Sequence, residues 1–242
     1  MPVSILQSCS DLLFPRSCEL CGCAPDRPGR HLCSDCLGRL DFIPTDGLCR
    51  RCGRDAPGLD GEFLCEDCRT YRPAFDRAAS ALRFDGDARE LVNAFKFRRA
   101  FHLRDDLVDF LEAAVRARFR VGEISAVIPI PSRFLHRFLR GYNPCEILAR
   151  PLARRLGVEY VASALKRCGS PRRQGGLKEA ERRENVKGTF RVARPAAVAD
   201  RTVLVVDDIM TTGSTLSEAA LTLKTAGARA VWTVSVARSL RL

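Results

Sequence analysis

The sequence has no long apolar run, and none of its hydrophobic stretches approaches the length needed to cross a membrane. Its first residues lack both the positive charge and the long apolar segment of a secretory signal peptide. We therefore expect no membrane insertion and a cytoplasmic protein. In that compartment thiols stay reduced, which decides how the cysteines are interpreted.

Cysteine is nearly absent from the C-terminal part, because ten of the 12 cysteines lie in residues 1–68 and only Cys145 and Cys168 follow. Charge divides at the same place. Residues 1–73 hold 9 Lys and Arg against 11 Asp and Glu, whereas the remainder holds 31 against 18. A chain of 242 residues can form one ordinary domain and a small one. We predict domains over residues 1–72 and 73–242, joined near residues 69–73.

Eight early cysteines form four Cys-x-x-Cys pairs, and the second half of this segment repeats the first at an offset of 31 to 32 residues. Each pair is a knuckle with two thiolates for one tetrahedral ion, and a glycine after each leading knuckle, Gly22 or Gly53, allows the turn. So small a module, poor in large apolar residues, needs metal to fold.

We therefore predict two structural Zn²⁺ ions in two four-cysteine ribbons. The predicted ligands are Cys18, Cys21, Cys33 and Cys36 in the first ribbon, and Cys49, Cys52, Cys65 and Cys68 in the second. A cross-braced pairing of alternate knuckles is an alternative, as are disulfides or redox dithiols. Cys9 and Cys23 do not fit the spacing and are interpreted as ordinary small residues.

Residues 203–215 read Val-Leu-Val-Val-Asp-Asp-Ile-Met-Thr-Thr-Gly-Ser-Thr. The four apolar residues predict a buried parallel strand, with Asp207 and Asp208 at its carboxyl end and an amphipathic helix from Leu216. A turn of small hydroxyl residues at a helix start is typical of phosphate binding, because unpaired backbone N–H groups and the helix dipole face the ligand. Carboxylates instead suit sugar hydroxyls or Mg²⁺. The alternative is ordinary capping, since Thr215 and Glu218 have the spacing of a capping box.

The region before this motif contains further predicted elements and one basic loop. Helical spacing over residues 87–97 and 105–119 indicates packing helices, and Lys96 is expected to be a solvated surface lysine. A short buried strand over residues 126–130 precedes a loop that carries Arg133, Arg137 and Arg140 before Gly141. Arginines in this setting suit pyrophosphate, and a basic surface helix is the alternative.

Residues 145–156 are expected to form a helix that Pro151 kinks or interrupts. Residues 166–187 hold eight Lys and Arg against three Glu without an apolar period, which indicates either a mobile loop closing over an anion or a solvated charged segment. Strands over residues 202–206 and 231–236 flank a predicted helix over residues 216–226.

The chain resembles the ComF family of competence-associated proteins along nearly its whole length. The resemblance rests on the two cysteine ribbons, the Pro-Ile-Pro strand end and the Arg-Gly-Tyr-Asn segment at residues 140–143. It rests further on residues 205–213, where the two Asp and the Thr-Thr-Gly turn resemble the loop with which type I phosphoribosyltransferases bind phosphoribosyl pyrophosphate. It also rests on a series formed by Gln174, Leu177, Arg182, Asn185 and Phe190. Pro144 departs from the family pattern, where Gln often follows Asn, and any contact made there is in doubt.

The resemblance implies an α/β fold: an open, mostly parallel sheet of the type I phosphoribosyltransferase kind with a small N-terminal double zinc-ribbon domain. It further implies that Asp207 and Asp208 hold the ribose hydroxyls of phosphoribosyl pyrophosphate bound with Mg²⁺. The 5′-phosphate would lie on Thr211, Thr212, Gly213, Ser214 and Thr215. Arg133, Arg137 and Arg140 would receive pyrophosphate, with Lys178, Arg182 or Arg183 closing over it. Such catalysis would be largely electrostatic, and no residue stands out as the proton acceptor.

The same resemblance links the chain to uptake of transforming DNA and to the machinery that performs it. A single-stranded DNA-binding module is therefore a second hypothesis, and the basic C-terminal part favours it. Exposed aromatic side chains for base stacking would be expected as well, and the chain has only one Trp and three Tyr. A third hypothesis is a catalytically silent sensor of phosphoribosyl pyrophosphate.

Overall fold

The computed structural model describes residues 16–55, 61, 63–132, 140–168 and 186–239. The ribbon region contains two short helices, α2 (Ser34–Gly38) and α3 (Glu66–Tyr71). The longer helices are α4 (Gly86–Phe97), α5 (Arg104–Arg118), α7 (Pro144–Leu156) and α9 (Ser214–Thr225). Single 3-10 turns are formed by Phe101–Leu103, Val121–Glu123 and Pro195–Ala197. No helix in these ranges is long and apolar enough to cross a membrane.

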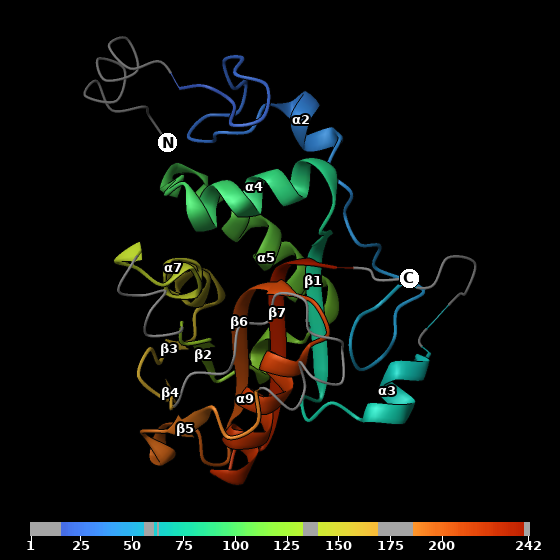
Figure 1. Cartoon of the computed structure of the whole chain (residues 1–242), viewed down its shortest axis with the longest axis vertical. Helices are drawn as coiled ribbons and strands as arrows, with labels where there is room; N and C mark the ends of the chain where they lie inside the picture. The colour runs from blue at the N-terminus through green and yellow to red at the C-terminus, as the bar shows by residue number, and fades with distance from the viewer. Residues whose placement is uncertain (1–15, 56–60, 62, 133–139, 169–185, 240–242) are drawn as a thin grey trace.

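A parallel sheet of five strands forms the centre of the molecule, in the order β1-β7-β6-β2-β3 (Figure 1). Its strands are β1 (Arg77–Arg83), β2 (Ala126–Pro129), β3 (Glu159–Tyr160), β6 (Thr202–Met210) and β7 (Ala230–Arg238). Two further strands, β4 (Leu165–Arg167) and β5 (Phe190–Val192), form a separate antiparallel pair. The parallel α/β architecture predicted from the sequence is therefore confirmed.

Strand β6 lies in the middle of the sheet, paired with β7 on one side and β2 on the other. Its apolar residues alternate between two cores, as strand geometry requires. Leu204 and Val206 pack in the cluster that contains α5 and α7 residues, whereas Val203 and Val205 pack with α9. Because helices cover both faces, every residue of the apolar run is buried.

Two element boundaries differ from the sequence expectation. Strand β6 continues past Val206 to Met210, because β7 is long enough to pair with it to the end. Helix α9 starts at Ser214, with Gly213 as its N-cap at φ 74°. The capping-box alternative is therefore wrong: Thr215 lies inside the first turn, and Glu218 Oε1 instead accepts a hydrogen bond from Gly188 N at 2.7 Å.

Of the two effects predicted for Pro151, a kink or an interruption, the interruption is absent, because helix α7 continues through this residue. The ring of a proline fixes φ near the helical value, and its missing N–H removes one hydrogen bond of the helix. Leu148 and Leu152 on either side are fully buried. Their burial in the core holds the helix through the missing bond.

Both cysteine ribbons share cores with the sheet domain. Cys18, Cys33 and Cys36 pack in the cluster formed with α4 and α5, and the second four-cysteine group packs with Phe75 and Ala78 on the α9 face. Figure 1 shows the first ribbon beside α4 and the second, with α3, beside β1. The predicted boundary between residues 72 and 73 stays a prediction.

The segment between the ribbons and the first knuckle of the second ribbon together cover the outer edge of β1. Ile43 N donates to Ala81 O at 2.9 Å, and Ala78 N donates to Arg51 O at 2.7 Å. Phe42 and Leu82 form an antiparallel bridge on the same edge. These contacts satisfy backbone groups that an open edge strand would leave available for aggregation.

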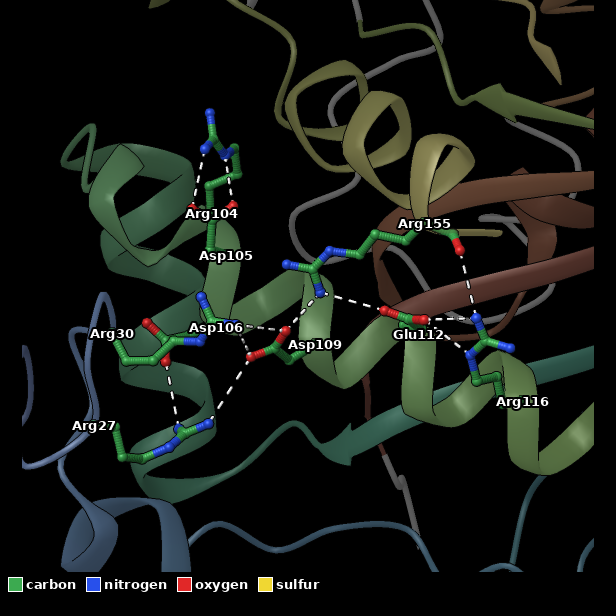
Figure 2. A network of polar contacts seen from close by, with 9 residues as sticks. All are labelled: Arg27, Arg30, Arg104, Asp105, Asp106, Asp109, Glu112, Arg116 and Arg155. Atoms are coloured by element: carbon green, nitrogen blue, oxygen red, sulfur yellow. Dashed lines mark hydrogen bonds and ion pairs between the residues drawn. The ribbon is translucent and has the colours of Figure 1, made fainter. Parts of the chain in front are cut away.

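A network of ion pairs ties the first ribbon to α5 and α7 (Figure 2). Asp106 of α5 is fully buried, accepts a hydrogen bond from His31 N at 2.9 Å and lies 3.6 Å from Arg27 Nη1. Burial raises the pKa of this carboxyl. One turn further along α5, Asp109 contacts both Arg30 of the ribbon and Arg155 of α7. Charges from three separate segments therefore fix the ribbon against the helices.

The glycine after the leading knuckle of each ribbon allows a comparison of how closely the two ribbons pack against the rest of the protein. Gly53 has φ 67°, and a Cβ there would lie 2.5 Å from Ala78 O, whereas the equivalent Gly22 has φ 75° and nothing within 4 Å. Either Gly→Ala change should lose about 1–2 kcal/mol for the left-handed backbone. Gly53→Ala should lose roughly 1–3 kcal/mol more, because backbone must move. Urea unfolding of the zinc-loaded variants measures the difference, and equal losses would contradict this packing.

Candidate functional site

The two adjacent carboxylates of the motif lie near the carboxyl end of β6, inside the strand. Asp207 and Asp208 are only 9% and 6% exposed. Asp207 Oδ1 accepts a hydrogen bond from Asp208 N at 2.9 Å, which fixes the orientation of the first carboxylate. Two neighbouring carboxylates buried together need a compensating cation or a proton.

Lys96 of α4 provides that cation. Its Nζ lies 2.7 Å from Asp208 Oδ2 and 2.9 Å from Oδ1, and its side chain is 22% exposed. The expectation of a solvated lysine is therefore wrong. Burial lowers the pKa of Lys96, but attraction to Asp208 outweighs it, so the net shift is upward and the ammonium stays charged. A sequence signal existed, since Lys96 follows the buried Ala88 and Val92 at i+4 spacing.

The other carboxylate contacts a buried thiol. Cys145, in the first turn of α7, donates from Sγ to Asp207 Oδ1 at 3.4 Å. Burial raises the pKa of Asp207 to about 7, with a further rise from Asp208 that Lys96 opposes. Burial also raises the pKa of Cys145, so the thiol keeps its proton. The carboxylate pair is thus a strong hydrogen-bond acceptor that one lysine partly neutralises.

The hydroxyl-rich turn follows directly. Gly213 has φ 74°, and a Cβ there would lie 2.8 Å from Met210 Cε, so the chain needs glycine at this point. Thr212 Oγ1 and Ser214 Oγ lie 2.6 Å apart, and Ser214 begins α9. Thr211 is exposed. The turn therefore brings hydroxyl groups together with the first turn of a 12-residue helix, and both are kinds of donor that suit a phosphate.

Arg140 is the described member of the predicted pyrophosphate arginines. Its guanidinium lies over the Phe97 ring at 4.6 Å from the centroid, and its carbonyl accepts a hydrogen bond from Arg99 Nη2 at 3.1 Å. Tyr142 Oη donates to Lys96 O at 2.9 Å. The C-terminal end of α4 thus contacts both sides of Gly141. Arg133, Arg137, Lys178, Arg182 and Arg183 lie outside the described residues.

Pro144 fits the structure at the position where the sequence raised doubt. It occupies the start of α7, where a helix needs no N–H from it, and Asn143 is the N-cap. Asn143 Oδ1 accepts from Cys145 N at 3.1 Å and from Ser132 Oγ at 2.7 Å, while Nδ2 donates to Ile130 O at 3.0 Å. The asparagine therefore joins the end of the β2 segment to the start of α7.

Two four-cysteine clusters have the geometry of zinc sites. In each cluster the four sulfur atoms lie within 4.8 Å of one another. The Cys21–Cys33 and Cys52–Cys65 sulfur atoms are 3.7 Å apart. A tetrahedral ion with Zn–S bonds of about 2.3 Å would hold its sulfur ligands about 3.8 Å apart. The residues present therefore fit zinc.

The clusters combine sequential knuckles, so the cross-braced alternative is wrong. Positive and N–H groups surround the sulfur atoms, as thiolate ligands require. Arg39 Nη2 donates to Cys36 Sγ at 3.2 Å, and Cys65 N donates to Cys49 Sγ at 3.4 Å. Exposed Cys23 is in neither cluster.

Comparison with known proteins assigns the two parts of the chain separately. A family model described as a double zinc ribbon domain matches residues 9–69, and one described as a phosphoribosyl transferase domain matches residues 143–241. A solved structure described as adenine phosphoribosyltransferase is 19% identical and covers 57% of this chain and 73% of its own, with a TM-score of 0.34.

Curated relatives match both parts together. Competence protein F of Haemophilus influenzae is 29% identical, over 86% of this chain and 90% of its own length. DNA utilization protein YhgH of Escherichia coli K12 is 28% identical over 95% and 100%. Competence protein ComFC of Streptococcus pneumoniae is 26% identical over 86% and 87%.

The fold, the strand-end motif and the cysteine clusters together define a phosphoribosyltransferase-fold protein with a double zinc ribbon. The relatives align with 86–95% of this chain, so each alignment extends into both matched domains. The chain is a homologue of the proteins named competence protein F, DNA utilization protein YhgH and competence protein ComFC.

Metal analysis tests the cysteine clusters. The purified protein should contain two equivalents of zinc, and a double Cys→Ser change in one knuckle, at Cys33 and Cys36 or at Cys65 and Cys68, should remove one equivalent. Cys23→Ser is the matched control and should keep both. Well under two equivalents after zinc-supplemented expression, or a loss on changing Cys23, would contradict the assignment.

Proposed function

We propose that this protein binds phosphoribosyl pyrophosphate with Mg²⁺ at the carboxyl end of β6, supported by two structural zinc ions in the ribbons, and that it works in the cytoplasm. The observation that carries the proposal is the buried Asp207–Asp208 pair directly before a phosphate-suited helix start. Ribose hydroxyls donate to carboxylates, and the 5′-phosphate accepts from the turn at residues 211–215. One ligand therefore satisfies both halves of the motif.

Mg²⁺ fits the proposal through its preference for oxygen ligands. The ligand brings phosphate oxygens, and the ion keeps several waters, so few protein oxygens are needed. The role of the carboxylates in this proposal is to hold the ribose, while the metal balances the charge of the diphosphate. If pentosyl transfer occurs, a cationic ribose transition state forms beside these carboxylates and gains electrostatic stabilisation there.

Calorimetric titration with phosphoribosyl pyrophosphate and Mg²⁺ tests the proposal. Changing Asp207→Asn together with Asp208→Asn should weaken binding by about 10-fold or more, because charge-assisted hydrogen bonds contribute roughly 1.5–3 kcal/mol each. Asp200→Asn is a matched control, since Asp200 is an exposed aspartate just before the opposite end of the same strand. An unchanged affinity in the double variant would place the ligand elsewhere.

A second candidate function is binding of single-stranded DNA. It is favoured by the names of the relatives, which refer to competence and DNA utilization, and by the excess of 31 Lys and Arg over 18 Asp and Glu after residue 73. Phosphate contacts from such residues give affinity without sequence preference. The two functions are compatible if the sugar-phosphate site and the basic surface are separate.

The salt dependence of DNA affinity separates the two functions. The slope of log affinity against log salt for single strands is about −0.7 per phosphate contact. Charge reversal at Arg172, Arg173, Arg182 and Arg183 should flatten that slope. Asp207→Asn with Asp208→Asn should leave the affinity equal or slightly higher, because negative charge is removed. The opposite pattern in fluorescence anisotropy would mean that DNA enters the strand-end site itself.

A further inference from the structure

The ammonium group of Lys96 has more hydrogen-bond donors than its ion pair with Asp208 uses. An ammonium group has three donors, and the contacts of Nζ in the described part of the chain go to the two oxygens of Asp208. At least one donor is therefore left over. The Lys96 side chain is 22% exposed, although it lies on the buried face of α4.

A second cation lies near the same aromatic ring as Lys96. The Phe97 ring centroid lies 5.9 Å from Lys96 Nζ and 4.6 Å from the Arg140 guanidinium carbon. The Arg99–Arg140 and Tyr142–Lys96 hydrogen bonds fix the backbone around this ring. An anion beside these two cations gains favourable electrostatic energy from both.

The identity of the anion follows from the rest of the proposed site. The helix start at Ser214 provides donors for the 5′-phosphate, and the carboxylates accept from the ribose hydroxyls. The diphosphate is the remaining anionic group of the ligand. We propose that Lys96 binds the diphosphate of phosphoribosyl pyrophosphate directly, together with Arg140; this inference rests on the proposed function. The ion pair with Asp208 holds the Lys96 ammonium beside the ribose.

Three ligands separate direct contact from a purely positioning role. Calorimetry with phosphoribosyl pyrophosphate plus Mg²⁺, inorganic pyrophosphate plus Mg²⁺, and ribose 5-phosphate compares the wild type with Lys96→Met and Lys96→Arg. Lys96→Met should weaken binding of the two diphosphate ligands by about 10-fold or more. Binding of ribose 5-phosphate should stay within about 2-fold of the wild type. Lys96→Arg should recover part of the loss, because it keeps a charged donor.

Lys224→Met is the matched control. Lys224 also forms a lysine–aspartate pair, with Nζ 2.5 Å from Asp76 Oδ1, but it lies at the end of α9 away from the motif. This variant should bind all three ligands as the wild type does. Lysine acylation of the wild type gives a test that does not depend on folding of a variant: pyrophosphate with Mg²⁺ should protect Lys96, and ribose 5-phosphate should not.

These experiments distinguish failure of the proposed function from failure of direct contact between Lys96 and the diphosphate. If the wild type binds no phosphoribosyl pyrophosphate, the proposed function fails and the role of Lys96 fails with it. If the wild type binds and Lys96→Met weakens all three ligands equally, Lys96 only positions Asp208 and direct contact is overturned. Unchanged diphosphate binding in Lys96→Met, or no protection of Lys96 by pyrophosphate, overturns it as well.

Discussion

The site depends on keeping two adjacent carboxylates buried at the end of the central strand. Asp207 and Asp208 lie between two helical layers, where an uncompensated charge is expensive. The ion pair with Lys96 of α4 and the hydrogen bond from Asp208 N compensate part of this charge. The pKa of Asp207 is about 7, so protonation of this carboxyl near neutral pH removes part of the remaining charge. A carboxylate pair kept only half-neutralised favours hydroxyl donors and accompanying cations over free phosphate.

The surroundings of the pair position it from both sides of the sheet. Helix α7 brings Cys145 to Asp207, and α4 brings Lys96 to Asp208 while contacting the loop end at Arg140 and Tyr142. The second ribbon takes part in the core of the α9 face, as the close approach of Gly53 to Ala78 shows. The ribbons therefore complete the hydrophobic layers around the sheet, and their zinc sites contribute to the same packed unit.

The sequence predicted the features that depend on local pattern. The parallel strands and the sequential grouping of the cysteine knuckles follow from apolar runs and spacing, and both are confirmed. The errors arise where a distant partner decides. Strand β6 extends to Met210 because β7 pairs with it there, and Glu218 bonds Gly188 in place of its own helix start. Lys96 is more than a hundred residues from Asp208 in sequence, so only the tertiary fold joins them, although its helical spacing already indicated the buried face.

We propose that one ligand spans the carboxylate pair and the hydroxyl-rich turn, and a crystal structure grown with phosphoribosyl pyrophosphate and Mg²⁺ would show whether it does. We expect ribose hydroxyls within hydrogen-bond distance of Asp207 and Asp208, and the 5′-phosphate on the N–H groups at residues 211–215. A ligand bound on another surface, or one whose phosphate lies against the carboxylates, would contradict it.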